Sequence, residues 1–229
     1  MISVIVPTYN EAGSLPPLVD RLASAMAGRD WELVVVDDGS PDGTADLAES
    51  LGTRHPVRVL RRAGKAGLAS AVIAGFETAR GDILAVMDAD LSHPPEVVPA
   101  LVDAIEGGAD LAVGSRYVRG GAIMDWPIRR RVVSRVACLM GNVLVPVRDA
   151  TSGFFAVRRA ALDGVRLNAI GFKIGLEVIA RAKADRIVEV PYTFRDRELG
   201  ASKFGRREIG QYLVQLGMVA RDRVLGRLR

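Results

Sequence analysis

The sequence predicts an α/β fold in which a mainly parallel central sheet is flanked by helices. In the first half of the chain, short runs of β-branched residues alternate with segments whose apolar residues recur at helical spacing. Residues 33–36 are continuously apolar, which is typical of a parallel sheet buried on both faces. With 229 residues, the chain is long enough for one large domain and short for two.

Strands that alternate with helices are joined by right-handed crossovers and become parallel neighbours. The strands expected in this half are residues 3–6, ending at the breaker Pro7, and residues 32–36, 57–60, 83–87 and 110–113. The expected helices are residues 14–26, 44–51, 68–79 and 95–105.

After Arg116 the alternation breaks, and Gly120-Gly121 indicates a loop. The elements expected beyond it are a helix over residues 129–144, a strand over 154–157, a helix over 172–184, a strand over 187–190 and a terminal helical segment. We expect one domain over residues 1–204. Residues 205–229 form a basic amphipathic arm that is not an independent domain.

Composition excludes several classes of site. Cys138 is the single cysteine, so an internal disulfide framework is excluded and a reducing, cytoplasmic compartment is expected. With two histidines and one cysteine, the usual zinc ligand set is nearly excluded, and carboxylates must hold any metal. Aromatic residues make up only 5% and no nucleic-acid-binding motif is present, so we expect no nucleic acid partner. Dinucleotide-binding and P-loop glycine motifs are absent as well.

Positive charge gathers in two places. The net charge of +4 equals that of residues 205–229, where six arginines face Glu208 and Asp222. Residues 116–135 carry six more arginines, interspersed with apolar and aromatic side chains. Such mixtures suit an anionic membrane surface, although a solvated basic face remains an alternative for the arm.

Neither a leader nor a membrane span is expected. The N-terminus lacks a basic flank followed by an apolar stretch, so it does not read as a signal peptide. The most apolar run, residues 136–147, is 12 residues long, whereas a span takes about 20. We therefore expect a peripheral protein at the cytoplasmic face of the membrane.

Acidic residues follow three of the expected strands. The strand ends read Pro7-Thr8-Tyr9-Asn10-Glu11, Asp37-Asp38-Gly39-Ser40 and Asp88-Ala89-Asp90. In an open parallel sheet, ligands bind beyond the carboxyl ends of the strands. Carboxylates that converge there repel one another unless a cation or a donor-rich ligand is present. Asp88 and Asp90 can hold a hard divalent ion that also takes diphosphate oxygens.

Other polar segments are candidates for the same site. Lys65-Ala66-Gly67 precedes a helix, where a cation and free amides could face an anion, although a surface lysine is the alternative. The polar turn 149–153 suggests a second ligand wall, and residues 195–203 form a loop rich in anion donors. Glu177 lies on an apolar helix face and needs a partner.

Together these segments resemble the dolichyl-phosphate (polyprenol-phosphate) mannosyltransferases, within the inverting family-two glycosyltransferases. The matching stretches cover most of positions 3–209 in order: VIVPTYNEAGSL, ELVVVDDGSPDGT, KAGLASAVIAGF, VMDADLSHPPE, AVGSRYV, RRRVVSR, DATSGFFAVRR, GFKIGLEVIARA and VPYTFRDRELGASKF. The resemblance implies a nucleotide-diphospho-sugar transferase (GT-A-like) fold with amphipathic interfacial helices, and a catalytic domain over residues 1–204.

The resemblance also implies roles for individual residues. The nucleotide-sugar site would comprise Pro7, Tyr9, Glu11, Val36, Asp38, Lys65, Asp88, Ala89, Asp90 and Lys203. The metal, Mg²⁺ or Mn²⁺, would lie on Asp88 and Asp90, with Ser92 at a position where many relatives have a metal-binding Gln. The acceptor phosphate would meet Arg116, Arg130, Ser134, Ser152 and Arg197. Asp88, Asp90, Arg116, Arg130 and Arg197 would carry catalysis.

The expected reaction is transfer of mannose from GDP-mannose to a polyprenyl monophosphate, with inversion. The acceptor phosphate is already anionic near pH 7, so no general base is needed. Some relatives append transmembrane helices, so a separate membrane-anchoring subunit is a possible partner. Two alternatives remain: a transferase of the same fold that uses UDP-glucose or another donor, and a non-catalytic nucleotide-sugar-binding protein at the membrane.

Overall fold

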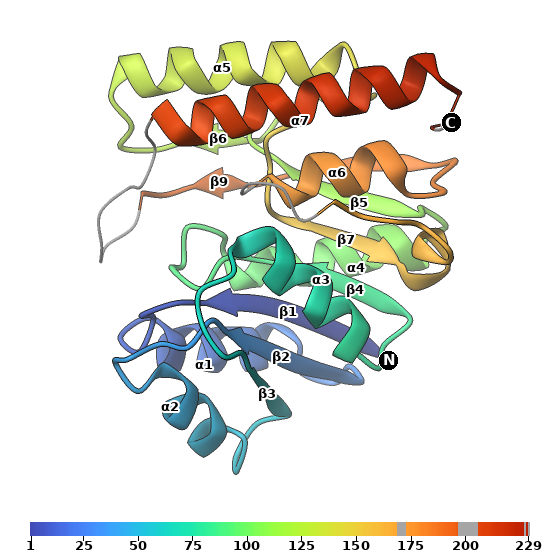
Figure 1. Cartoon of the computed structure of the whole chain (residues 1–229). Coiled ribbons are helices and arrows are strands. Elements are labelled where there is room, and N and C mark those ends of the chain that lie inside the picture. The colour runs from blue at the N-terminus through green and yellow to red at the C-terminus, as the bar shows by residue number, and fades with distance from the viewer. Residues whose placement is uncertain (169–172, 197–205, 227, 229) are drawn as a thin grey trace.

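The computed structural model describes residues 1–168, 173–196, 206–226 and 228. Seven strands form one sheet in the order β3-β2-β1-β4-β7-β5-β8, and β6 pairs with β9 in a separate two-stranded sheet (Figure 1). The strands are β1 (Ile2–Thr8), β2 (Trp31–Asp37), β3 (Val57–Arg61), β4 (Ile83–Val86), β5 (Leu111–Ser115), β6 (Ala122–Ile123), β7 (Phe155–Arg158), β8 (Ile187–Pro191) and β9 (Thr193–Phe194).

Helices connect the strands in the alternation that the sequence predicts. They are α1 (Leu15–Ala25), α2 (Thr44–Leu51), α3 (Leu68–Thr78), the 3₁₀ turn η1 (Pro95–Val97), α4 (Val98–Glu106), α5 (Ile128–Asn142), the 3₁₀ turn η2 (Arg159–Leu162), α6 (Ile174–Arg181) and α7 (Arg206–Val224). The helix expected over 95–105 therefore begins as a 3₁₀ turn. The expected start of α6, at residue 172, lies outside the described residues.

The sheet is mainly parallel, as expected, with one exception. β7 lies between β4 and β5 and runs antiparallel to both. Because β4 and β5 are both antiparallel to β7, their carboxyl ends lie at the same edge of the sheet. The short pairing of β6 with β9 is not predicted by the sequence, since two residues are too few to show alternation.

Pro7 does not end the first strand as expected. β1 continues to Thr8, pairing with β2 along its whole length, whereas its pairing with β4 stops at Ile5. Beyond Ile5, the side of β1 that faces β4 is not paired in the β1–β4 ladder, so the missing N–H of Pro7 is tolerated there.

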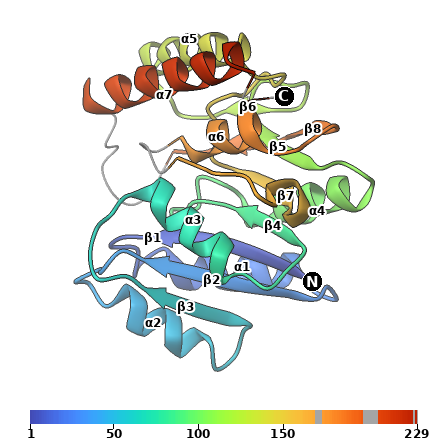
Figure 2. The ribbon, with the colours of Figure 1, turned by 45° about the vertical axis from the view of Figure 1, so that its right-hand side comes forward.

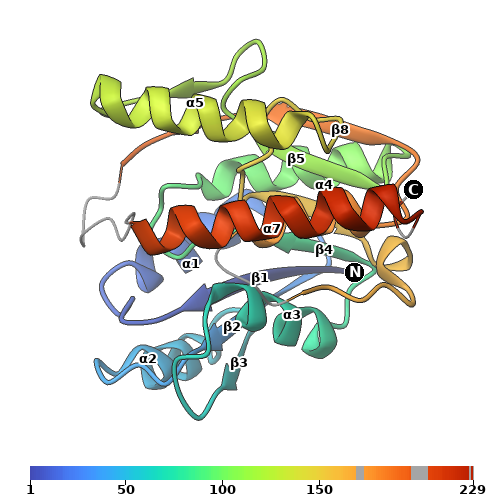
Figure 3. The same ribbon diagram turned by 45° about the horizontal axis from the view of Figure 1, so that its top comes forward.

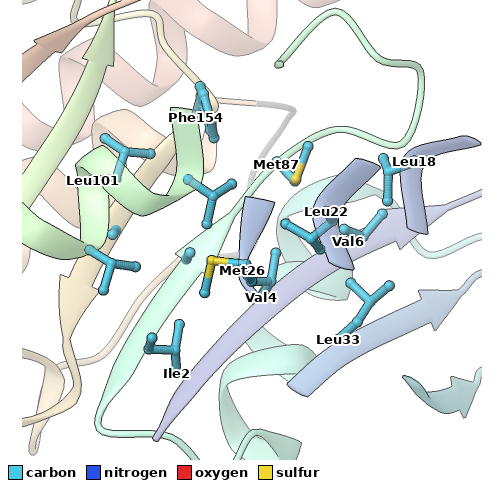
Figure 4. Close-up of a cluster of buried hydrophobic side chains, with 14 of the residues drawn as sticks. Ile2, Val4, Val6, Leu18, Leu22, Met26, Leu33, Met87, Leu101 and Phe154 are labelled. Carbon is cyan, nitrogen blue, oxygen red and sulfur yellow. The ribbon is translucent and has the colours of Figure 1, made fainter. Parts of the chain in front are cut away.

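Two apolar layers sandwich the sheet. On one face, β1 and its neighbours pack against α1, α2 and α4, and Figure 4 shows part of this cluster, including Leu18, Leu22 and Met26 of α1 around Val4 and Val6. On the other face α3, α6 and α7 cover the sheet. This arrangement is visible when the ribbon is turned (Figure 2).

The C-terminal helix is integrated with this core rather than detached from it. Tyr212, Leu216 and Val219 of α7 are buried. Glu177 of α6 accepts hydrogen bonds from Arg181 and from Asn168, which supplies the partner that the sequence requires. Arg181 in turn pairs with Asp222 of α7 at 2.7 Å.

Helices α5 and α7 lie side by side at one end of the molecule and run in the same direction (Figure 3). The Tyr212 hydroxyl donates to the Ala137 carbonyl at 2.8 Å, and Arg223 donates to the Leu144 carbonyl at 2.9 Å. Among the described helices, none has both the length and the apolar character required to cross a bilayer.

Candidate active site

The segments that the sequence singles out meet at one edge of the sheet. Thr8 is in register with Asp37 across β1 and β2, so the chain leaves both strands at the same level. β4 runs parallel to β1 and delivers Asp88 to this edge, while β5 delivers Arg116. The edge therefore has a carboxylate side, beyond β1, β2 and β4, and a guanidinium side, beyond β5.

On the carboxylate side, three of the residues expected in the nucleotide pocket are buried at the edge of the sheet. Pro7, Val36 and Ala89 are buried, so they shape the edge through packing. The Tyr9 ring is half-buried, and the Lys65 ammonium lies 4.0 Å from its centroid. The Glu11 carboxylate accepts a hydrogen bond from the Ser14 hydroxyl at 2.8 Å.

Asp38 is buried, and its carboxylate is hydrogen-bonded to other parts of the chain. Its carboxylate accepts hydrogen bonds from Arg62 at 2.7 Å and from the backbone amides of Ala66 and Gly67 at 3.1 and 3.0 Å. These contacts tie the loop before α3 to the end of β2. The expectation of free amides in the 65–67 segment is therefore wrong, since two of them are already bonded to a carboxylate.

Asp88 and Asp90 lie in the short loop after β4, and both are partly exposed. The Asp88 side chain is 35% exposed, which leaves it open to a ligand. One Asp90 oxygen accepts the Ser92 amide at 3.0 Å, which fixes the loop. The Ser92 side chain is only 2% exposed, so this geometry does not favour it as the third metal ligand.

The two carboxylates fit a divalent cation. Mg²⁺ is commonly held by one or two carboxylates together with substrate phosphates and water. In the described part of the chain, no group of three or more His, Cys, Asp or Glu side chains is placed to hold a metal. A cation on Asp88 and Asp90 would therefore complete its coordination shell with oxygens of bound phosphates and of water.

His93 closes the same loop and is not singled out by the sequence. The Asp88 amide donates to His93 Nδ1 at 3.0 Å. The ring stacks on Phe154 with centroids 4.9 Å apart. Burial lowers the pKa of His93, because the buried imidazole is costly to charge, and the attraction of Asp88 and Asp90 does not offset this cost.

On the guanidinium side, Arg116 is buried and held by Asp149. Nε and Nη2 donate to the two Asp149 oxygens, each at 2.7 Å, and Nη2 also reaches the Thr151 hydroxyl at 2.8 Å. Burial alone would raise the pKa of Asp149, but the charge and hydrogen bonds of Arg116 outweigh it and hold the pKa below its usual value. Nη1 takes no part in these bonds and remains for a ligand.

Aromatic rings gather the other acceptor candidates around Arg116. The guanidinium carbons of Arg116 and Arg130 lie 5.7 and 4.0 Å from the Trp126 centroid. Arg130 also pairs with Asp196 at 2.6 Å. The Ser134 hydroxyl accepts a hydrogen bond from Tyr117 at 2.8 Å. Arg116, Arg130 and Ser134, which are 18 positions apart at most, thus come together through Trp126 and Tyr117.

A surface groove of about 370 Å³ opens onto this cluster. Its lining combines three guanidinium groups with apolar and aromatic surface: Arg116, Tyr117, Ile123, Arg131, Val132 and Arg135. Arg131 and Arg135 are not among the residues that the sequence assigns to the acceptor. Their helical spacing places them on one face of α5.

Two further residues of this side differ from expectation. Ser152 is buried, and its hydroxyl accepts the Phe154 amide at 3.2 Å, so it stabilises a turn rather than facing a ligand. Lys173, missed by the sequence analysis, donates to the Thr151 carbonyl at 2.8 Å. Burial and the nearby Arg116 lower the pKa of Lys173 to about 8, although Asp149 counteracts them. Arg197 and Lys203 lie outside the described residues.

Comparison with known proteins shows the family to which the chain belongs. The family model for glycosyl transferase family 2 matches residues 3–166. The chain is 48% identical over 216 residues to a dolichol-phosphate mannosyltransferase of Pyrococcus furiosus, covering 93% of this chain and 61% of that protein. It is 44% identical to a polyprenol monophosphomannose synthase of Mycolicibacterium smegmatis, covering 98% and 88% of the two chains. Against the dolichol-phosphate mannosyltransferase of Saccharomyces cerevisiae, the identity is 41%, with 93% and 85% covered.

Solved structures resemble the fold as well. Glucosyl-3-phosphoglycerate synthase from Mycobacterium tuberculosis, in complex with phosphoglyceric acid, superposes with a TM-score of 0.70 at 26% identity, covering 95% of this chain and 80% of that one. The same enzyme with Mn²⁺, UDP-glucose and phosphoglyceric acid gives a TM-score of 0.70 at 25% identity, with the same coverage. The matched family model spans most of the chain, including Asp88, Asp90 and Arg116, and the protein is a member of glycosyltransferase family 2 with a GT-A-like fold.

Proposed function

We propose that the protein transfers mannose from GDP-mannose to a polyprenyl monophosphate, giving polyprenyl phosphate mannose with inversion at the anomeric carbon. The observation that carries this proposal is the division of one sheet edge into a carboxylate pair and a guanidinium site that opens onto a surface groove. Relatives named for dolichol or polyprenol phosphate mannose synthesis, at 41–48% identity, support the choice of substrates.

On the donor side, Asp88 and Asp90 would hold Mg²⁺ or Mn²⁺. When bound, such a cation neutralises the charge that develops on a leaving diphosphate. Pro7, Val36 and Ala89 would form the floor under the nucleotide, and Tyr9 with Lys65 would flank it. Asp38 would act mainly through the loop that it holds, and its contact with the nucleotide sugar stays a prediction.

On the acceptor side, Arg116 would present Nη1 to the lipid phosphate while Asp149 holds the rest of the guanidinium. Arg130 and the Ser134 hydroxyl would complete this phosphate site. Arg197 stays a predicted contributor to it, and Lys203 stays a predicted contributor to the nucleotide-sugar site. A phosphate monoester has a second pKa near 6, so its oxygen is anionic at neutral pH and attacks without a general base. Attack from the face opposite the diphosphate inverts the anomeric configuration.

The surface of α5 and α7 supports a lipid substrate. Ile128, Val132, Val136, Leu139 and Val143 form an exposed apolar stripe along α5, with exposed fractions between 50% and 81%. Ile209 and Leu213 extend the apolar surface onto α7. Exposed arginines of both helices flank it, a combination that suits the anionic interface of a membrane. The groove at Arg116 opens beside α5, so a lipid phosphate at headgroup depth would reach it.

The proposal also includes a membrane partner and a second class of donor. The chain spans 61% of the length of the Pyrococcus relative, and a separate membrane-anchoring subunit stays a proposed partner. A second donor class is also supported by one observation, since a structural neighbour binds UDP-glucose.

Transfer assays test the proposal. Purified protein with Mg²⁺ or Mn²⁺ is incubated with short polyprenyl phosphates and a panel of radiolabelled sugar nucleotides. We expect a mannosylated lipid phosphate from GDP-mannose and a larger rise in Tm with GDP than with UDP, because ligands stabilise the state that binds them. Preferred transfer from UDP-glucose would establish the alternative donor. Nucleotide binding with neither transfer nor donor hydrolysis would identify a non-catalytic binding protein.

A further inference from the structure

His93 connects the two sides of the site, although it belongs to neither set of expected ligands. Its side chain is buried and contacts rings from three separate strands or strand ends. It stacks on Phe154, which precedes β7, and meets Tyr192 and Phe194 edge-on at 5.8 and 6.2 Å. Phe194 in turn lies 5.6 Å from the Arg116 guanidinium carbon. The imidazole is thus fixed by the packing of the guanidinium side.

The polar contact of this ring points to the carboxylate side. His93 Nδ1 accepts the backbone N–H of Asp88 at 3.0 Å. A nitrogen that accepts carries no proton, so the ring is neutral and its proton lies on Nε2. The Met87 amide bonds to the Ile5 carbonyl of β1, and the next amide, that of Asp88, points to the opposite side of the strand. On that side the last pair of the β4–β7 ladder is Val86 with Phe155, two residues before Asp88. His93 provides the hydrogen-bond acceptor for the Asp88 amide just beyond the end of β4.

The loop between these two residues needs such a restraint. Leu91 has φ +62°, a left-handed conformation that is unfavourable for a residue with a Cβ. This turn brings His93 back to Asp88, and the Ser92 amide meanwhile bonds to Asp90. The His93 contact therefore holds the backbone of Asp88 just beyond the end of β4.

We propose that His93 is a positioning residue that sets Asp88 for metal and diphosphate binding by holding its backbone amide. The inference rests on the proposed role of Asp88 and Asp90 in binding the cation. His93 contributes the hydrogen-bond acceptor at Nδ1, and the aromatic packing on the guanidinium side fixes the position of this atom. The proposed role includes no direct contact with the substrate. Residues that orient metal ligands typically change metal affinity about 10- to 100-fold when they are replaced.

A matched pair of variants separates the acceptor from the ring. His93→Phe keeps the stacked ring and removes the acceptor, whereas His93→Asn removes the ring and keeps an acceptor one bond beyond Cγ. Mn²⁺ binding in the presence of GDP, followed by electron paramagnetic resonance, should weaken about tenfold in His93→Phe and stay within about threefold of wild type in His93→Asn. The same order is expected for the Mn²⁺ concentration that gives half-maximal transfer, with kcat at saturating Mn²⁺ less affected.

Amide exchange tests the contact without metal. In the metal-free protein, exchange of the Asp88 amide should accelerate about tenfold in His93→Phe and remain slow in His93→Asn. Equal Mn²⁺ affinity in His93→Phe and wild type would overturn the proposal, as would an Asp88 amide that stays protected in His93→Phe. If Asp90→Asn leaves Mn²⁺ affinity unchanged, the proposed metal site fails instead, and the amide exchange still decides whether His93 holds Asp88.

Discussion

The two sides of the sheet edge hold their charges in opposite ways. Asp88 lies two residues after β4, is about one-third exposed and is held by a histidine five positions away. Arg116 follows β5 directly but is 7% exposed and bonded to Asp149, 33 positions away. On the carboxylate side, short loops expose groups to a ligand at little cost in stability. On the guanidinium side, a buried ion pair couples ligand binding to folding, so substitutions there alter both.

The largest effect is expected from Asp88→Ala. Loss of this ligand should reduce transfer about 1000-fold, since cation stabilisation of a leaving group contributes several kcal/mol. Tm should change little, because the side chain is partly exposed. The measurement is single-turnover transfer at saturating metal and donor. Turnover near that of wild type would remove Asp88 from the proposed metal site.

Asp149→Asn should show the opposite pattern, with a loss of stability first. Removing one partner of a buried ion pair leaves an uncompensated charge and costs about 3–5 kcal/mol. Urea unfolding followed by fluorescence measures this loss. A loss of unfolding free energy smaller than about 1 kcal/mol would show that the Arg116–Asp149 pair contributes little to the stability of the fold.

The same pair should make stability depend on pH at the acid end. The folded protein holds the pKa of Asp149 below its ordinary value of 3.8. The stabilisation is therefore complete above the unfolded pKa, near 4, and is lost as the pH falls through the folded pKa. Urea midpoints between pH 6 and pH 3 should fall more steeply for wild type than for Asp149→Asn. Parallel curves would contradict the assignment.

The proposed membrane surface of α5 and α7 allows a change that spares both sides of the site. Val136→Asp with Leu139→Asp places two charges on the exposed stripe of α5 and should reduce flotation with anionic liposomes about tenfold. Ala27→Asp, at an exposed position after α1, is the matched control. Binding of wild type should also weaken at high salt. No binding of wild type at low salt would count against a membrane surface.

The smallest effect is expected at the rim of the nucleotide pocket. Lys65→Ala removes an exposed cation–π contact with Tyr9, which is worth about 0.5–1 kcal/mol, so the donor KM should rise about two- to fivefold. Tyr9→Phe keeps the ring and should change KM less. A rise beyond about tenfold would indicate that Lys65 binds the donor phosphates directly.

The carboxylate side was largely predictable because it is local. The runs before Thr8, Asp37 and Asp88 define parallel strands, and parallel strands bring their carboxyl ends to one edge whatever the rest of the chain does. Close to this edge, Asp42 accepts the Thr44 amide at the start of α2, a contact that spans only two residues. The sequence analysis missed the role of His93, because a sequence pattern does not distinguish a histidine that packs in the core from one that binds a ligand.

The sequence by itself determined the alternation of strands and helices, the acidic loop after β4 and the basic, apolar character of the segments that became α5 and α7. Only the tertiary structure decided that β7 runs antiparallel between β4 and β5, that Asp149 holds Arg116, and that Trp126 brings Arg130 beside it. The reason is physical: periodicity and strand-end chemistry act over a few residues, whereas the partner of a buried charge is chosen by the packing of segments far apart in the chain.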